Sequence, residues 1–259
     1  MEHISGVIRN ITLDIDTKKE CSICGKEYKQ IIVGKEPFRI KCYEAQCTCE
    51  KEAAVKADKE REERERREIS AALLAKRFDN SMMSKRLMKM DFEILNPEQN
   101  VKEIEFCKKY VRAFNIETSE GIQLLGNTGT GKSSLMACIC NNLIKRGYNC
   151  LFTTLSALLS DFVQYSGEHF GSISNKLNWL IKYDFIVLDD IGRENITDKR
   201  KEILFQIIDT LYNEEKIIAF TANPEMLLKL KQDKELAAIL DRIKSLCPHV
   251  LKFSGESLR

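Results

Sequence analysis

From residue 91 onward, the chain alternates between short apolar runs and longer amphipathic stretches. The apolar runs are GIQLL at 121–125, NCLFT at 149–153, FIVLD at 185–189, IIAFT at 217–221 and HVLKF at 249–253. Stretches such as KSSLMACICNNLIKRG and KRKEILFQIIDTLYNEE separate these runs and predict helices. Short apolar strands joined by helices are typical of an α/β fold. We therefore expect a parallel sheet of five strands that helices cover on both faces.

Two regions precede the α/β pattern: residues 1–50, which are rich in cysteine, and residues 51–77, which are rich in charged side chains. Residues 51–77 alternate acidic and basic side chains without Gly or Pro, and pairs such as Glu60–Arg64 and Glu63–Arg67 place the acid four residues before the base. The polar all-round pattern predicts a solvated linker helix, with a partner-binding helix as the alternative. The expected domains are thus a cysteine-rich domain at 1–50, a charged helical linker at 51–77 and the α/β domain at 78–259.

Composition narrows the class of protein. The 259 residues are 43% hydrophobic and 31% charged, and no apolar run approaches the roughly 20 residues that span a bilayer. The first ten residues, MEHISGVIRN, lack the pattern of a signal peptide, so we expect a cytoplasmic protein in a bacterial cell with no membrane partner. The formal net charge of +2 argues against a duplex-DNA reader with a strongly basic face.

The segment GNTGTGKSS matches the phosphate-binding pattern GxxxxGK[ST], after a predicted strand and at the start of a predicted helix. Glycines let the backbone N–H groups point at phosphate oxygens, and the helix directs its positive end at them. Lys132 supplies a cation to the β- and γ-phosphates of ATP, and the Ser133 hydroxyl ligates Mg²⁺. The predicted nucleotide-binding residues of this segment are Gly126, Asn127, Thr128, Gly129, Thr130, Gly131, Lys132, Ser133 and Ser134.

Polar side chains end two later strands. In DFIVLDDIG, Asp189 is suited to hold Mg²⁺, and Asp190 is the candidate base that orients and deprotonates the attacking water. In FTANPEM, Asn223 is either a residue that positions water or the γ-phosphate, or a simple Asn-Pro turn residue.

The first 50 residues contain a candidate zinc site. Cys21 and Cys24 form a C-x₂-C pair, and Cys47 and Cys49 form a C-x-C pair. Four thiolates satisfy the coordination that zinc prefers, and Cys42 could replace Cys47 or Cys49. A domain of this size has little core, so the metal would supply much of its folding energy.

Residues 78–259 resemble the AAA+ ATPases of the DnaC/DnaI helicase-loader and IstB group. The resemblance rests on LGNTGTGKSSLMACICNNL, IVLDDIG, FTAN, ILDRI and the final GESLR. It implies that Arg242 reaches the ATP of a neighbouring subunit and that Arg259 reads the γ-phosphate in its own subunit. Two positions depart from the family pattern, because Asp190 stands where Glu is common and Leu258 replaces an aromatic residue.

The resemblance implies an ATP-dependent loader of a replicative hexameric helicase of the DnaB type. Such a loader acts on single-stranded DNA and self-associates through its ATP sites, and we expect it in a phage or prophage-like replication module. Zinc-bearing N-terminal domains also occur in DnaI-like loaders, which favours this reading. Residues 158–179 match the region where such proteins contact DNA. There Phe162, Tyr165 and Phe170 either stack on bases or pack in the core.

Two other functions remain open at this point. One is an IstB-like transposition helper, an ATPase that binds duplex DNA and a transposase. The other is a zinc adaptor whose ATPase domain is a nucleotide-sensing switch.

Overall fold

The computed structural model describes residues 20–34, 40–44, 46–95, 99–167, 173–192 and 196–254. The chain divides into two units, Met1–Ser70 and Ala71–Arg259. The boundary falls within helix α1, which runs over Cys49–Asn80. The predicted boundaries near residues 50 and 77 stay predictions.

The first unit contains a small antiparallel hairpin. Strand β1 (Lys29–Val33) pairs with β2 (Ile40–Glu44), and an isolated bridge joins Glu20 to Glu27. The acidic and basic side chains of α1 form exposed ion pairs along the helix, such as Glu63 with Arg67 at 3.7 Å. Exposed pairs of this kind contribute little stability, so α1 depends chiefly on the helix propensity of its residues.

The second unit is built on a five-stranded sheet in the order β4-β5-β6-β3-β7, and every pair in it is parallel. This confirms the predicted fold class. The strands are β3 (Ile122–Gly126), β4 (Cys150–Thr154), β5 (Phe185–Ile191), β6 (Ile217–Ala222) and β7 (His249–Phe253). The helices are α2 (Lys85–Met88), α3 (Val101–Ala113), α4 (Lys132–Lys145), α5 (Leu155–Gly167), α6 (Ile173–Leu180), α7 (Asp198–Asn213), α8 (Pro224–Leu230) and α9 (Lys234–Leu246).

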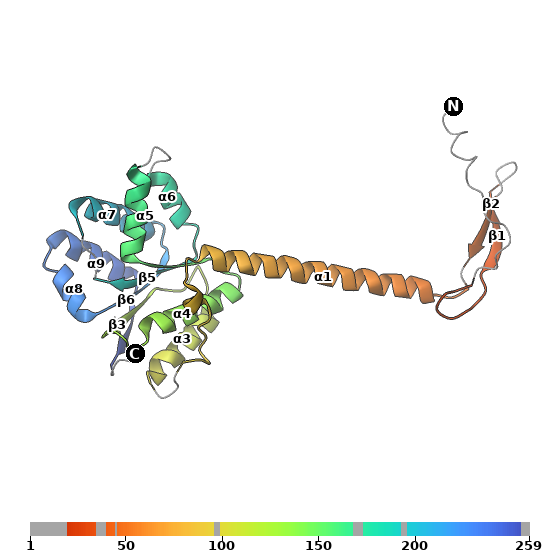
Figure 1. Cartoon of the computed structure of the whole chain (residues 1–259), viewed down its shortest axis with the longest axis horizontal. Helices are drawn as coiled ribbons and strands as arrows, with labels where there is room; N and C mark the ends of the chain where they lie inside the picture. Colours follow the sequence, from red (N-terminus) through yellow and green to blue (C-terminus); the bar gives the residue numbers. More distant parts are fainter. Residues whose placement is uncertain are drawn as a thin grey trace, which may run out of the picture. The chain divides into compact units, whose positions relative to one another are not determined.

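Alternate residues of β4, β5 and β6 enter two separate cores. Ile186 and Leu188 of β5 pack with buried residues of α5, α7 and α9, whereas Phe185 and Val187 pack with α3 and α4 (Figure 1). Successive side chains of a strand point to opposite faces of the sheet, and both faces are apolar here. These strands therefore appear in the sequence as continuous apolar runs. No helix in the described ranges is both long and apolar enough to cross a membrane.

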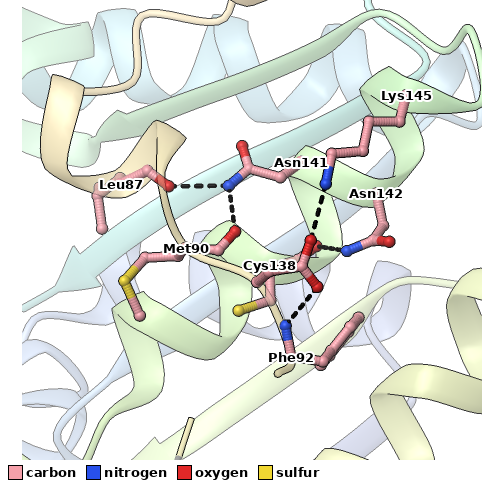
Figure 2. A network of polar contacts seen from close by, with 8 residues as sticks. Leu87, Met90, Phe92, Cys138, Asn141, Asn142 and Lys145 are labelled. Atoms are coloured by element: carbon pink, nitrogen blue, oxygen red, sulfur yellow. Dashed lines mark hydrogen bonds and ion pairs between the residues drawn. The ribbon is translucent and has the colours of Figure 1, made fainter. Parts of the chain in front are cut away.

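Polar contacts fasten the segment around α2 to α4, the helix that follows the predicted phosphate loop. The Asn141 side-chain nitrogen donates to the carbonyl oxygens of Leu87 at 2.8 Å and Met90 at 2.7 Å (Figure 2). One turn further along α4, the Lys145 ammonium lies 2.7 Å from the Asp91 carboxylate. Asn141 is buried, so these bonds satisfy backbone carbonyls where α2 ends.

Candidate nucleotide site

The backbone of the phosphate loop requires glycine at two positions. A Cβ on Gly126 would lie 2.5 Å from the carbonyl oxygen of Phe253 on the adjacent strand β7, so only glycine fits there. Gly131 has a φ of 89° and is the N-cap of α4, without a side-chain hydrogen bond to the cap. The first N–H groups of α4 therefore remain available to an anion.

Lys132 points into this loop. Its ammonium donates to the carbonyl oxygens of Gly126 at 2.8 Å and Asn127 at 2.6 Å, and it lies 3.4 Å from the Thr130 hydroxyl. The side chain is buried, so these oxygens replace the water that the cation loses. The loop thus concentrates positive charge and N–H donors in one place, which suits phosphate.

Ser133, Asp189 and Thr221 form a partly buried cluster beside the loop. The Ser133 hydroxyl donates to Asp189 Oδ1 at 2.9 Å, and the Thr221 hydroxyl donates to the same oxygen at 2.6 Å. Burial raises the pKa of Asp189, and the two hydroxyl donors act against that rise. A hydroxyl and a carboxylate are ligands that Mg²⁺ accepts, so Ser133 and Asp189 are placed to share one ion.

The backbone changes direction at Asp190. Its φ is 60°, and the register between β5 and β6 shifts between Leu188 and Ile191. The Asp190 N–H donates to the Thr221 hydroxyl at 2.8 Å. A bulge at the end of a strand re-aims a side chain, and a non-glycine residue with positive φ is a feature that clusters at functional sites. Asp190 therefore stands at the bulge, directly after the carboxylate that is placed to hold Mg²⁺.

Asn223 follows β6 at the same edge of the sheet. Its side-chain oxygen accepts the Glu225 N–H at 3.0 Å, and the residue caps α8, which begins with Pro224. Its contacts are therefore those of the turn-and-cap alternative. A role toward water or the γ-phosphate stays a prediction.

Arg242 lies on α9 and contacts α7. Its guanidinium forms an ion pair with Asp209, and it lies 5.1 Å from the ring centroid of Phe205 and 6.0 Å from that of Tyr212. Phe205, Asp209 and Tyr212 share one face of α7, and the Arg242 side chain is 40% exposed. Among the contacts of the described residues, none joins Arg242 to the phosphate loop of its own chain.

Several expected residues lie outside what the structure describes. Arg259 and Phe170 are among them, and so is the side chain of Cys42, a residue of β2. Phe162 is fully buried in the core, in agreement with the packing alternative, while Tyr165 is partly exposed beside Lys176.

The four predicted zinc ligands come together in the first unit. The sulfur atoms of Cys21, Cys24, Cys47 and Cys49 all lie within 4.8 Å of one another. Tetrahedral coordination at a Zn–S distance of about 2.3 Å separates the sulfurs by about 3.8 Å, so the cluster fits zinc. Gly25, with a φ of 70°, closes the turn between Cys21 and Lys26.

The thiols of this cluster are not equivalent. The backbone N–H of Lys26, together with hydrogen bonds from the neighbouring thiols, lowers the pKa of Cys24 to about 7. The same network has the opposite effect on Cys47, where the interaction with Cys21 raises the pKa to about 12. Cys24 is therefore the first of these two thiols to ionise and to attract a cation.

Two contacts of the candidate residues do not follow from the sequence patterns. Thr221 binds both Asp189 and Asp190, and its only signal is a hydroxyl within an otherwise apolar strand. Asp209 pairs with Arg242 from another helix, and no local pattern marks that contact.

The fold and the loop define the class of protein: a P-loop nucleotide-binding protein with the sheet of an AAA+ ATPase. A family model described as IstB-like ATP binding protein matches residues 36–259. The chain belongs to this family.

Individual relatives agree with this assignment. The replicative helicase loader DnaC of Escherichia coli is 28% identical over 149 residues, which are 57% of this chain and 59% of that protein. An insertion sequence ATP-binding protein of Sinorhizobium fredii, y4uH, is 28% identical over 146 residues, 56% of this chain and 58% of that one. The matched region thus spans less than two thirds of either relative.

A solved structure shows the same fold. The crystal structure of the DnaC helicase loader aligns with a TM-score of 0.57 and 21% identity, over 66% of this chain and all of that one. The resemblance to DnaC-type and IstB-type AAA+ proteins stated from the sequence is therefore confirmed.

Proposed function

We propose that this chain is an ATP-dependent loader that places a replicative hexameric helicase on single-stranded DNA, of the kind that phage or prophage replication genes encode. The observation that carries the proposal is that one chain combines a nucleotide site with a cysteine cluster. The chain has a P-loop site with the Ser133–Asp189 contact, and a separate unit with four converging cysteines. An ATPase joined to a zinc-dependent module is the organisation expected of a loader with its own helicase-binding domain.

In the proposed hydrolysis step, Lys132 and the N–H groups of the loop hold the β- and γ-phosphates of ATP. Ser133 and Asp189 hold Mg²⁺, which offsets the negative charge that develops on the phosphates. Asp190 orients the attacking water and accepts its proton, a role that its position at the bulge after Asp189 supports. Asn223, at the end of β6, helps to position the attacking water or the γ-phosphate.

Two arginines complete the ATP site in this proposal. Arg242 acts on the ATP of a neighbouring copy, which fits its half-exposed position and its lack of contact with its own loop among the described residues. Arg259 acts on the γ-phosphate of its own subunit. ATP binding then favours self-association, and hydrolysis releases the assembly.

The partners follow the domains expected from the sequence. We propose that residues 1–77, which include the zinc cluster, bind the helicase, while residues 158–179 contact single-stranded DNA. The protein would then act in the bacterial cytoplasm.

A transposition helper is the second candidate, because the matching family model describes IstB-like proteins and the relative y4uH is named for an insertion sequence. The four-cysteine cluster favours the loader. A nucleotide-sensing zinc adaptor, the third function considered from the sequence, differs from both because it would bind ATP without turnover.

A loading experiment separates these functions. The full chain is mixed with a DnaB-type helicase and circular single-stranded DNA, and DNA-bound helicase is quantified with and without ATP. We expect ATP-dependent loading, and we expect Cys24→Ser to lose helicase capture while Lys132→Ala retains capture but fails to load. Capture of a transposase on duplex DNA, without any helicase, would replace the proposal with the IstB-like function.

A further inference from the structure

We infer that a pocket at the amino-terminal edge of the central sheet binds a nucleotide unit, that is, an aromatic base carrying a phosphate. The pocket has a volume of about 360 Å³, within the roughly 300–1,000 Å³ typical of small-molecule sites. It combines two cations, two aromatic rings and two amides, supplied respectively by Arg77 and Lys182, Trp179 and Tyr183, and Asn80 and Asn149.

This pocket is separate from the P-loop. Asn149 precedes β4, and the segment from Trp179 to Tyr183 precedes β5, so the pocket lies where these strands begin. The P-loop follows the carboxyl end of β3. In a parallel sheet these two ends lie on opposite edges, so one nucleotide cannot occupy both places.

The two cations of the pocket are available to an anion. Arg77 and Lys182 form no ion pair or side-chain hydrogen bond with any residue in the described ranges. The nearby acid, Asp184, is engaged with the backbone N–H of Asn149 at 2.8 Å. An arginine and a lysine that converge without acidic partners favour phosphate, which accepts hydrogen bonds from both.

The aromatic rings are fixed in place. Trp179 and Tyr183 are edge to face, with centroids 5.2 Å apart and an interplanar angle of 82°. The Tyr183 hydroxyl donates to the Asn80 carbonyl at 3.0 Å, and the Lys176 ammonium lies 4.5 Å from the Trp179 centroid. A restrained aromatic surface beside free cations suits a base whose phosphate points toward the cations.

The amides complete the recognition. Asn80 and Asn149 are exposed at the rim, and an amide side chain offers both a donor and an acceptor to the edge of a base. The same chemistry is present in a free nucleotide and in one unit of a nucleic-acid strand. This inference goes beyond the ATP chemistry proposed above and does not depend on it.

Trp179 is the single tryptophan of the chain, so its fluorescence reports on this pocket directly. The full-length protein, as wild type and as Lys132→Ala, is titrated with dTMP, with a twelve-residue oligothymidylate and with inorganic phosphate, so that a response that persists in Lys132→Ala does not come from the P-loop. We expect saturable quenching by at least one of the two thymidine probes. Quenching by both indicates a free-nucleotide site, and quenching by the oligonucleotide alone indicates a strand. No quenching by either probe, or an equal response to inorganic phosphate, would overturn the inference.

Charge-reversed variants locate the binding. Lys182→Glu should raise the dissociation constant of the quenching probe on the order of tenfold, as expected for loss of a charged contact to phosphate. Lys229→Glu, the same change at an exposed position on α8, should alter it less than twofold. Equal weakening by both variants would show non-specific attraction and contradict the pocket. The ATPase rate of Lys182→Glu is measured in parallel. An ATPase rate of Lys182→Glu equal to that of the wild type would show that this pocket is independent of ATP hydrolysis. If the protein did not hydrolyse ATP at all, the fluorescence result would still test the pocket.

Discussion

The Thr221 hydroxyl lies 2.6 Å from Asp189 Oδ1 and receives the N–H of Asp190 at 2.8 Å. One side chain of β6 therefore fixes both carboxylate residues at the end of β5. Because Asp189 is only 8% exposed, loss of this donor leaves a buried oxygen with one hydroxyl partner fewer.

This relationship gives the first prediction. Thr221→Val should lower the free energy of unfolding by about 1–3 kcal/mol, since it removes a hydrogen bond to a buried acceptor without a change of shape. It should also weaken Mg²⁺-dependent ATP turnover, because Asp189 loses the group that orients it. Thr221→Ser, which retains the hydroxyl, is the control for denaturant unfolding and for turnover. If Thr221→Val matched the wild type in both measurements, Thr221 would have no positioning role.

The cysteine cluster predicts one bound Zn²⁺ for each chain. Elemental analysis of protein purified without chelators should show one equivalent, and Cys24→Ser should lose it because a ligand is removed. The variant should lose structure in the first unit but still bind ATP, since the second unit has its own cores. Cys107→Ser is a matched control, as Cys107 is buried outside the cluster. Zinc-free wild-type protein with an intact first unit would contradict the prediction.

The position of Arg242 predicts complementation between chains. Arg242→Ala and Lys132→Ala should each be inactive alone but active when mixed, because the first supplies an intact P-loop and the second supplies the arginine. Arg259→Ala should gain nothing from the same partner, since its defect lies in the only site that binds ATP. Arginine contacts to a transferring phosphate contribute on the order of 10³–10⁵ in rate. Equal rescue of both variants would refute the distinction between them.

The contact between Lys145 and Asp91 predicts a pH-dependent loss of stability (Figure 2). The hydrogen bond from Lys145 lowers the pKa of Asp91 below its usual value of 3.8. A lowered acid pKa stabilises the fold above that value, and the contribution disappears as the pH falls through the lower, folded-state pKa. Lys145→Met should therefore reduce stability by up to about 1 kcal/mol at pH 7, as is typical of a partly exposed pair. Urea unfolding should show the two proteins converging as the pH falls below the usual Asp pKa of 3.8, and a difference that stays constant during this fall would exclude the ion pair as the cause.

The sequence predicts the sheet well because its strands are buried on both faces. The runs at 185–188 and 217–220 are apolar at every position, and such runs bounded by polar residues have few alternatives to a central strand. The P-loop is equally predictable, because its backbone requires glycine at positions such as Gly126 and Gly131.

Other features depend on contacts between distant segments. The hairpin of β1 and β2 has no strong alternating pattern in the sequence, and the register shift at Asp190 arises from pairing with β6. The capping contact of Asn223 and the pairing of Arg242 with Asp209 likewise require the positions of neighbouring helices. Residue type suggested candidates at these positions, but only the fold shows which groups meet.

The measurement that tests the account most directly is steady-state ATP hydrolysis by the full chain, compared with nucleotide binding, in Lys132→Ala and Asp190→Asn. Lys132 contacts the phosphates before reaction, so its variant should lose Mg·ATP binding. Asp190 acts on water, so its variant should bind Mg·ATP near normally and lose turnover by on the order of 10²-fold or more. Normal turnover by Asp190→Asn, or normal binding by Lys132→Ala, would contradict the central claim that this P-loop and this carboxylate form an ATP-hydrolysing site.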